Sequence, residues 1–210
     1  ERAKQNGVRV VNNPQAIRDC NEKLFATEFS ALMPTTWVSS QHEDIRAFQQ
    51  SQGGIILKPL DGMGGSGIFR ITSDGLNLGA VLETLSPNES RLVMAQEYRP
   101  EITDGDRRVL VLHGQPISHV LARIPSQGET RGNLAAGGRG VAMPISDRER
   151  EIAETVGPYL LERGLLFVGL DVIGGHLTEI NVTSPTCVRE IDAQANTQIG
   201  HDFFEALFNQ

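Results

Sequence analysis

The segment KPLDGMGGSGIFR, residues 58–70, contains four glycines and one serine among its thirteen residues. Gly62, Gly64 and Gly67 match the G-x-G-x-x-G pattern of dinucleotide-binding loops, in which the loop leads directly into a helix. Here residues 68–72 follow, and they are mostly β-branched or aromatic, which favours a strand. The glycine-rich segment is therefore expected to connect two strands, and this context excludes the dinucleotide-binding fold.

A glycine-rich segment between two strands can serve as a flap over phosphate groups. The segment lacks the G-K-[ST] ending that a Walker A loop requires. Its unobstructed backbone amides can instead close over phosphate oxygens, as in the glycine-rich loop of protein kinases, with Lys58 nearby as a positive charge. A plain glycine-rich hairpin is the alternative, and this segment alone does not decide between the two.

The composition indicates a globular protein with an acidic balance. The chain has 210 residues, 39% of them hydrophobic, and a formal net charge of -7. This length accommodates one large domain or two smaller ones. The negative charge argues against nucleic acid as a partner, because duplex-binding proteins present a basic face, and no apolar run reaches the ~18 residues that span a membrane. The distant Cys20 and Cys187 predict no disulfide framework and favour a reducing cytoplasm.

Hydrophobic periodicity and turn residues predict a mixed order of helices and strands. Strands are expected at residues 8–11, 54–59, 68–72, 92–98, 107–112, 117–124, 166–173 and 177–182, with residues 34–38 extended. Helices are expected from Asn13 onward, at residues 21–29, 43–50, 76–85 and 146–164, and at the C-terminus. Strands pair through hairpins rather than in regular βαβ units, so the predicted fold class is α+β.

Three oxygen-bearing side chains near the C-terminus are candidates for a metal site. Asp171 lies in an apolar strand, where a carboxylate needs a counterion or a metal, and Glu179 and Asn181 share one face of the next strand. Two carboxylates and an amide oxygen suit Mg²⁺. A three-residue loop at residues 174–176 would place Asp171 opposite Glu179, whereas a two-residue loop would place it opposite Thr178. The metal interpretation therefore requires an odd-length loop, and separate, solvated or salt-bridged carboxylates are the alternative.

Arginines are spread over the second half of the chain at Arg108, Arg123, Arg131, Arg139 and Arg189. Arg131 and Arg139 lie in a glycine-rich loop at residues 125–140, and loops of this length are usually functional or disordered. Arginine is the preferred partner of carboxylate and phosphate groups. A loop that carries Arg131 can close over a site and exclude water, while a surface position without a function is the simpler interpretation of any single arginine.

Five segments carry a joint resemblance to a known family: RDCNEKLF (18–25), ILKPLDGMGG (56–65), DGDRRVLV (104–111), ARIPSQGETRGNLAAGGRG (122–140) and FVGLDVIGGHLTEINVTSPT (167–186). Together they resemble the bacterial glutathione synthetases, which are ATP-grasp ligases. The resemblance covers nearly all 210 residues. The long loop and the TEINVTSPT segment are typical of this family rather than of ATP-grasp proteins in general.

The resemblance implies an ATP-grasp fold, in which two α+β subdomains with antiparallel sheets grip a nucleotide between them. Residues 1–18 would be a remnant of an N-terminal or central substrate domain. Residues 19–95 would be the first subdomain with the glycine flap, and residues 96–210 the second, with hinge, lid loop and metal hairpin. Family members carry an additional N-terminal domain that helps to bind the dipeptide, so this chain alone is expected to bind Mg-ATP but to ligate poorly.

The resemblance also implies a reaction, in which ATP, γ-glutamylcysteine and glycine give glutathione, ADP and phosphate through an acyl phosphate. Mg²⁺, with Mn²⁺ as an alternative, is the expected cofactor, and ATP is a co-substrate. The expected partners are these small molecules, without nucleic acid or membrane, and the full-length protein is expected to be a homo-oligomer. There are two alternatives: another ATP-grasp carboxylate–amine ligase, and a nucleotide-binding fragment without turnover.

The resemblance assigns roles to the residues at matching positions. Contacts to ATP are expected from Lys23 and Lys58 at the phosphates, from the flap residues Gly62, Gly64, Gly65 and Ser66, from the adenine-binding hinge Gln96, Glu97 and Tyr98, and from Asp106 at the ribose. The expected metal ligands are Asp171, Glu179 and Asn181. The arginines that would stabilise the transferring phosphoryl group or bind substrate carboxylates are Arg108, Arg123 and Arg131. The peptide site would be lined by Ser184, Pro185 and Thr186.

Overall fold

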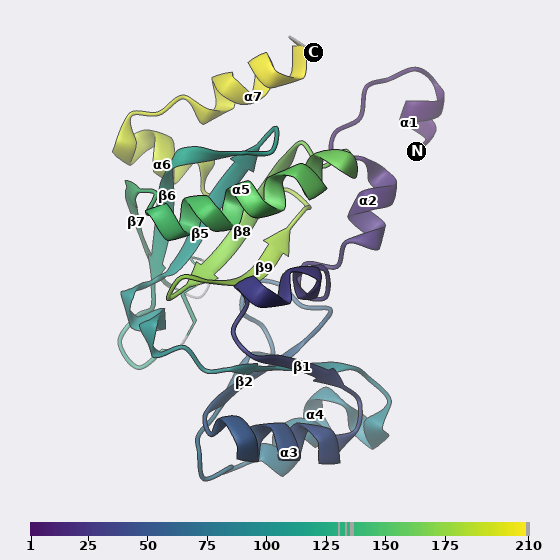
Figure 1. Ribbon diagram of the computed structural model, residues 1–210, viewed down its shortest axis with the longest axis vertical. Helices are drawn as coiled ribbons and strands as arrows, with labels where there is room; N and C mark the ends of the chain where they lie inside the picture. Colours follow the sequence, from purple (N-terminus) through teal and green to yellow (C-terminus); the bar gives the residue numbers. More distant parts are fainter. Residues whose placement is uncertain (130, 133, 135–136, 209–210) are drawn as a thin grey trace.

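The computed structural model describes residues 1–129, 131–132, 134 and 137–208 as two bodies, each built on one sheet (Figure 1). The smaller body holds a four-stranded sheet in the order β1-β4-β2-β3, and the larger body a five-stranded sheet in the order β7-β6-β5-β8-β9. All paired strands run antiparallel. Helices pack outside both sheets, so the α+β prediction is confirmed. Within the described ranges, no helix is long and apolar enough to cross a membrane.

The smaller body directs one face of its sheet toward the larger body. It contains β1 (Thr36–Ser39), α3 (His42–Gln52), β2 (Ile55–Pro59), β3 (Phe69–Ile71), α4 (Leu78–Leu85) and β4 (Val93–Glu97). Both helices lie on the outer face (Figure 1), where Ile55 and Leu57 pack with Leu82. Because side chains alternate along a strand, Ile56 and Lys58 point to the opposite, inner face.

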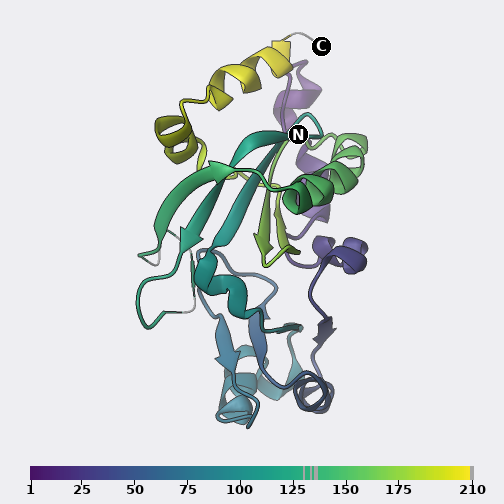
Figure 2. The ribbon, with the colours of Figure 1, turned by 60° about the vertical axis from the view of Figure 1, so that its left-hand side comes forward.

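The five-stranded sheet of the larger body has one apolar face and one face that carries charged side chains. Its elements are β5 (Asp106–Leu112), β6 (Gln115–Ile124), β7 (Arg139–Pro144), α5 (Asp147–Glu162), β8 (Phe167–Ile173), β9 (His176–Asn181), α6 (Val188–Ala195) and α7 (Ile199–Phe208). Helix α5 covers one face of the sheet, and α6 and α7 lie on the other side (Figures 1 and 2). Val109 packs under α5, whereas Leu110 packs with α6. The same alternation puts Arg108 and Asp171 on the face away from α5.

Helix α5 begins with a capping box and lies very close to the β5–β6 turn. The Ser146 side chain accepts a hydrogen bond from the backbone N–H of Glu149, and the Glu149 carboxylate accepts one from the Ser146 N–H at 2.8 Å. A Cβ on Gly157 would overlap the carbonyl oxygen of Gly114 in the turn. Glycine at position 157 is therefore what allows the helix to pack directly against the turn.

The remaining elements are short: α1 (Arg2–Gln5), α2 (Pro14–Asp19) and the 3₁₀ segments η1 (Phe25–Leu32), η2 (Pro87–Glu89) and η3 (Pro100–Asp104). Helix α2 begins as predicted, because the Asn13 side chain accepts a hydrogen bond from Gln15 N. Phe25 and Phe29 of η1 belong to the core beneath the larger sheet. The chain therefore contributes to the larger body before it enters the smaller one.

Three expectations about secondary structure are wrong. Residues 8–11 form no strand, because none of the strands in the described part of the chain pairs with them. The predicted helix at residues 21–29 is replaced by the 3₁₀ turns of η1. Strand β7 begins at Arg139, inside the predicted loop, because pairing with β6 supplies its backbone hydrogen bonds, and α6 was not expected at all.

Candidate functional site

A cavity of about 470 Å³ lies between the two bodies, and its size is typical of small-molecule sites. Every residue to which the sequence resemblance assigns a role lines it: Lys23, Lys58, Gly62, Gly64, Gly65, Ser66, Gln96, Glu97, Tyr98, Asp106, Arg108, Arg123, Arg131, Asp171, Glu179, Asn181, Ser184, Pro185 and Thr186. The fold thus brings together residues that are up to 163 positions apart, from 23 to 186. Their individual roles remain predictions.

Asp171 forms the centre of a buried charge cluster. Arg108 donates from Nε to Asp171 Oδ1 at 2.6 Å and from Nη2 to Oδ2 at 3.2 Å, and Arg123 Nη2 lies 2.9 Å from Oδ2. Burial alone would raise the pKa of Asp171, but the two guanidinium groups outweigh it and hold the pKa well below its usual range. Asp171 is therefore ionised, and both of its oxygens are engaged by arginine.

Asp106 shares Arg123 with Asp171 but has a free acceptor atom. Arg123 Nη2 lies 2.6 Å from Asp106 Oδ2. Burial, partly offset by Arg123, raises the pKa of Asp106 to about 6. Its second oxygen, Oδ1, is buried and has no hydrogen-bond partner in the described part of the chain. A buried acceptor without a partner on a cavity wall is suited to a ligand hydroxyl group.

Two buried lysines converge on one carboxylate from the two bodies. Lys23 Nζ and Lys58 Nζ each lie 3.6 Å from Glu179 Oε1. Lys23 also donates to the carbonyl oxygen of Gly62 at 2.8 Å and forms an ion pair with Glu22. Burial lowers the pKa of Lys58, and Glu179 partly offsets this. Two ammonium groups directed into one cavity provide a binding place for an oxyanion such as phosphate.

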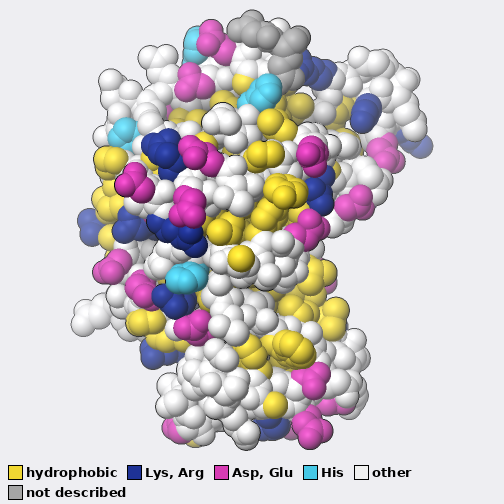
Figure 3. Space-filling view, in the orientation of Figure 1, with side chains coloured by type: hydrophobic (Ala, Val, Ile, Leu, Met, Phe, Trp, Pro, Cys, Tyr) yellow, Lys and Arg dark blue, Asp and Glu magenta, His cyan; other side chains and the backbone are white. Residues whose placement is uncertain are grey.

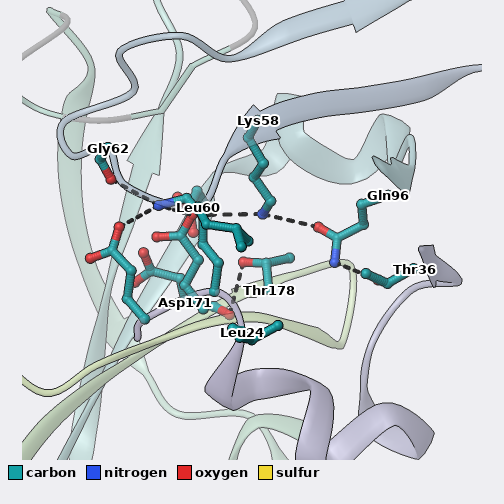
Figure 4. A network of polar contacts seen from close by, with 12 residues as sticks. Leu24, Thr36, Lys58, Leu60, Gly62, Gln96, Asp171 and Thr178 are labelled. Atoms are coloured by element: carbon teal, nitrogen blue, oxygen red, sulfur yellow. Dashed lines mark hydrogen bonds and ion pairs between the residues drawn. The ribbon is translucent and has the colours of Figure 1, made fainter. Parts of the chain in front are cut away.

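A chain of hydrogen bonds runs from Lys58 to the start of β1 (Figure 4). Lys58 Nζ donates to Gln96 Oε1 at 3.2 Å, and Gln96 Nε2 donates to Thr36 Oγ1 at 2.9 Å. Thr36 in turn donates to the carbonyl oxygen of Pro34 at 2.8 Å. Since that carbonyl only accepts and the ammonium only donates, the orientation of the Gln96 amide is fixed from both ends. Thr36 could not be recognised from the sequence, because its partner Gln96 is distant in the chain.

In the β8–β9 hairpin, Asp171 and Glu179 pair as predicted, but the turn that connects the strands differs from the prediction. Its turn has two residues, Gly174 and Gly175, both with positive φ, so the expectation of an odd-length loop is wrong. A register shift after Asp171 leaves Thr178 as an extra residue in β9, which is a β-bulge. The bulge restores the register, and Asp171 lies opposite Glu179 as predicted.

The oxygen atoms of the hairpin are chemically suited to a magnesium ion. Asp171, Glu179 and Asn181 share one face of the paired strands and line the cavity. In the described part of the chain, no group of three or more His, Cys, Asp or Glu side chains could hold a metal by itself. Mg²⁺, however, usually takes only one or two protein carboxylates and completes its shell with phosphate and water. The three side chains therefore fit an ion that arrives with a nucleotide.

The glycine-rich segment forms a flap over the cavity, between β2 and β3, as predicted from its sequence context. Gly64 has φ 65° and Gly65 has φ 83°, a region that favours glycine. Arg131 donates from Nη1 to the carbonyl oxygen of Gly65 at 3.4 Å and pairs with Glu129 at 2.6 Å. The flap and the loop that carries Arg131 therefore meet over the same cavity. Residues 130, 133, 135 and 136 of the predicted lid lie outside the described residues.

The cavity also contains residues that the sequence did not single out: Glu22, Ile56, Met63, Ile68, Arg99, Ile102, Gly132, Leu134, Ile173, Thr178, Thr183, Cys187 and Glu190. The apolar members form the hydrophobic part of the cavity lining, which most ligand pockets have. Apolar lining residues belong to no sequence motif and therefore cannot be recognised from the sequence. Cys187 is buried, and burial raises the pKa of its thiol.

The outer surface differs from this cavity. On the face drawn in Figure 3, the described basic and acidic side chains are interspersed over the larger body. The strongest concentration of buried charge is instead inside the cavity, where Lys23, Lys58, Arg108, Arg123, Asp106 and Asp171 are all buried. The cavity therefore offers both positive and negative side chains to a polar ligand.

Solved structures with this arrangement define the fold class. The chain is similar to an ATP-grasp ligase, PsnB, complexed with minimal precursor, Mg and ADP (TM-score 0.68, 24% identity, 98% of this chain and 64% of that chain). It is also similar to D-cycloserine synthetase DcsG (TM-score 0.72, 15% identity, 97% and 74%) and to D-alanyl-alanine synthetase A from Vibrio cholerae (TM-score 0.64, 14% identity, 99% and 70%). The fold is therefore the ATP-grasp fold.

The sequence comparisons are more specific. Residues 22–196 match the family model for the ATP-grasp domain of prokaryotic glutathione synthetase, and the chain belongs to this family. It is 59% identical over 210 residues to glutathione synthetase of Pseudomonas aeruginosa, covering 100% of this chain and 66% of that protein. It is 57% identical over 207 residues to the enzyme of Shewanella oneidensis, covering 99% and 66%. The chain thus spans just under two thirds of the length of these relatives.

Proposed function

We propose that the protein joins γ-glutamylcysteine and glycine in an ATP-dependent reaction that gives glutathione, ADP and phosphate. The observation that carries this proposal is the identity of 53–61% to relatives described as glutathione synthetase, over 92–100% of the chain. The cavity supports it, because its charged side chains suit the phosphates of a nucleotide and a polar substrate. Its mixture of buried lysines, arginines and carboxylates is typical of phosphoryl-transfer sites, which rely on positioning and charge.

In the proposed reaction, a carboxylate oxygen of the dipeptide attacks the γ-phosphorus of ATP, the bond from this phosphorus to the bridging oxygen breaks, and ADP leaves while the acyl phosphate forms. The glycine amine then attacks the acyl carbon, and phosphate leaves. Lys23 and Lys58 would hold phosphate oxygens, while Arg108 and Arg123, fixed by Asp171, would face the transferring group. The flap and Arg131 would shield the acyl phosphate from water. No protein nucleophile is required.

We further propose Mg²⁺ as the cofactor, held by Asp171, Glu179 and Asn181 together with the nucleotide phosphates. The ion would neutralise charge on the phosphate oxygens, as metals do in phosphoryl-transfer sites. Glu179 already lies within reach of both cavity lysines. The Glu179 carboxylate would therefore contact both the two lysines and the ion. Mn²⁺ would serve as a substitute, since it accepts the same oxygen donors.

The division of the chain follows from the same proposal. Residues 19–95 would form the first ATP-grasp subdomain and residues 96–210 the second, with the nucleotide between them, and residues 1–18 would lead in from a substrate domain. The natural full-length protein would be a cytoplasmic homo-oligomer. The two buried free cysteines, Cys20 and Cys187, agree with a reducing compartment.

Product identification tests the proposed function. The full-length natural protein, incubated with Mg-ATP, γ-glutamylcysteine and glycine, is expected to give glutathione and an equal amount of phosphate, measured by mass spectrometry and phosphate release. Faster phosphate release with another pair of substrates would instead indicate a related ligase. Binding of Mg-ATP without any turnover would indicate a nucleotide-binding protein. An Asp171→Asn variant serves as the inactive control.

A further inference from the structure

The cavity contains as many acidic as basic side chains, and almost all of them neutralise one another. The basic residues are Lys23, Lys58, Arg99, Arg108, Arg123 and Arg131, and the acidic residues are Glu22, Glu97, Asp106, Asp171, Glu179 and Glu190. A carboxylate in such a cavity that has no protein cation beside it is available to a positively charged group of a ligand. The pairing of each acid therefore indicates where a positively charged ligand group can bind.

Five of the six acids have a basic partner. Glu22 pairs with Lys23, Glu97 with Arg99, Asp106 and Asp171 with Arg123, and Glu179 with both lysines. Glu190 is the exception, because it has no ion pair and no side-chain hydrogen bond to any residue that the structure describes. The unneutralised negative charge of the cavity wall is therefore concentrated at one side chain.

Glu190 lines the cavity and is far from the flap in the sequence. It belongs to the first turn of α6, which begins directly after Cys187. The adjoining residues Ser184, Pro185 and Thr186 line the same cavity, and the family resemblance in the sequence implies that the peptide binds at these residues. A glutamate in the first turn of a helix also interacts favourably with the helix dipole. This effect is the same on every side of the helix, so it does not explain why Glu190 lines the cavity.

We propose that Glu190 binds the primary ammonium group of an amino-acid substrate. This inference rests on the proposed function, in which two such groups exist: the amine of glycine before it reacts, and the α-ammonium of the γ-glutamyl moiety. An ammonium group offers three donors and a full positive charge, and the other cavity acids are already paired. Glu190 therefore selects, at the position where it binds, an amino acid over a simple carboxylic acid.

The test uses Glu190→Gln, which keeps the size of the side chain and removes its charge. In the full-length protein, KM is measured for glycine, γ-glutamylcysteine and ATP, each varied separately. Loss of a charged hydrogen bond is expected to raise one KM about tenfold or more, with the KM for ATP unchanged. A rise for glycine identifies its amine as the ligand, and a rise for γ-glutamylcysteine identifies the α-ammonium.

Two further variants separate binding from folding. Glu190→Asp keeps the charge and should recover part of the lost affinity. Glu162→Gln makes the same change at an exposed position of α5 and should leave all three KM values unchanged. An unchanged KM for both amino-acid substrates in Glu190→Gln would overturn the inference, as would equal increases for all three substrates. The proposed function fails separately, if the unaltered protein forms no glutathione.

Discussion

At the scale of single residues, Asp171 is the carboxylate that two buried arginines of the site share. It is the shared partner of Arg108 and Arg123, and all three side chains are buried. The sequence could single out Asp171, because a carboxylate in an apolar strand needs a partner. It could not identify the partners, since positions 108 and 123 meet position 171 only through the strand order β6-β5-β8.

Replacement of Asp171 by Asn is expected to destabilise the protein strongly. The change preserves shape but leaves two buried guanidinium groups with too little negative charge, which should lower the free energy of unfolding by about 3 kcal/mol or more. Because the native pKa of Asp171 lies below its unfolded value, its contribution is present above about pH 4 and is lost as the pH falls through the native pKa. Urea unfolding at pH 7 and at lower pH measures both effects.

The control for this prediction is a carboxylate without buried partners. Glu162→Gln removes one charge from the exposed side of α5 and should change the free energy of unfolding by less than about 0.5 kcal/mol. A loss below about 1 kcal/mol in Asp171→Asn would contradict the view that the aspartate neutralises both arginines.

Thr36 is expected to affect nucleotide binding although it lies outside the set of predicted site residues. Thr36→Val removes the acceptor of the Gln96 amide, so the amide is no longer held with its oxygen toward Lys58. Loss of one hydrogen bond of about 1 kcal/mol corresponds to roughly a fivefold weaker binding of Mg-ATP. Isothermal titration calorimetry with a non-hydrolysable ATP analogue measures this change.

Two matched variants test the origin of the Thr36 effect. Thr36→Ser keeps the hydroxyl group and should bind within about twofold of the unaltered protein. Thr155→Val removes an exposed hydroxyl of α5 that donates only to its own helix, at Glu151 O, and should have no effect. If Thr36→Ser weakened binding as much as Thr36→Val, the hydrogen bond to Gln96 would not be responsible.

At the scale of elements, the sequence predicts most strands and helices. It does not predict the β-bulge at Thr178 or the close contact between Gly157 and Gly114, which orient or position these elements. The alternation along β8 and β9 indicated which residues share a face. The bulge at Thr178 could not be predicted, because it depends on how the two strands pair and not on any residue type that marks it. The apolar residues of α5 were recognisable by their spacing, whereas the close approach of Gly157 to Gly114 requires the packed structure.

Gly157→Ala is expected to destabilise the protein, even though alanine is the better helix former. Helix propensity alone would stabilise α5 by up to about 1 kcal/mol. The new Cβ would overlap the Gly114 carbonyl oxygen, and a backbone atom cannot move aside cheaply, so overpacking should cost about 1–3 kcal/mol and outweigh the propensity. Thermal unfolding should show a lower Tm.

Gly200→Ala is the matched control within another helix. A Cβ at Gly200 would meet nothing within 4 Å, so only the propensity term acts. This variant should be as stable as the unaltered protein or slightly more stable. Equal behaviour of the two variants would show that the contact between α5 and the turn does not constrain the helix.

At the scale of the whole molecule, the two sheets have largely separate hydrophobic cores and the cavity lies between them. Ile55 and Leu57 belong to the core of the smaller body, and Val109 and Leu170 to that of the larger. The sequence predicted the hairpins of both sheets but not the cavity, whose walls combine side chains from both bodies. From the sequence, only the family resemblance indicated that side chains of both bodies form one site.

A nucleotide bound between the bodies should stabilise the molecule as a whole. With Mg²⁺ and a non-hydrolysable ATP analogue at about 100 times Kd, the free energy of unfolding is expected to rise by about 2.7 kcal/mol, or roughly 5–10 °C in Tm. Lys58→Met, in the smaller body, and Asp171→Asn, in the larger body, should each reduce this increase relative to their own ligand-free Tm. If the ligand contacted one body alone, only one of the two variants would lose the shift. Loss in both, measured by scanning calorimetry, is the outcome that requires a site formed jointly by the two sheets.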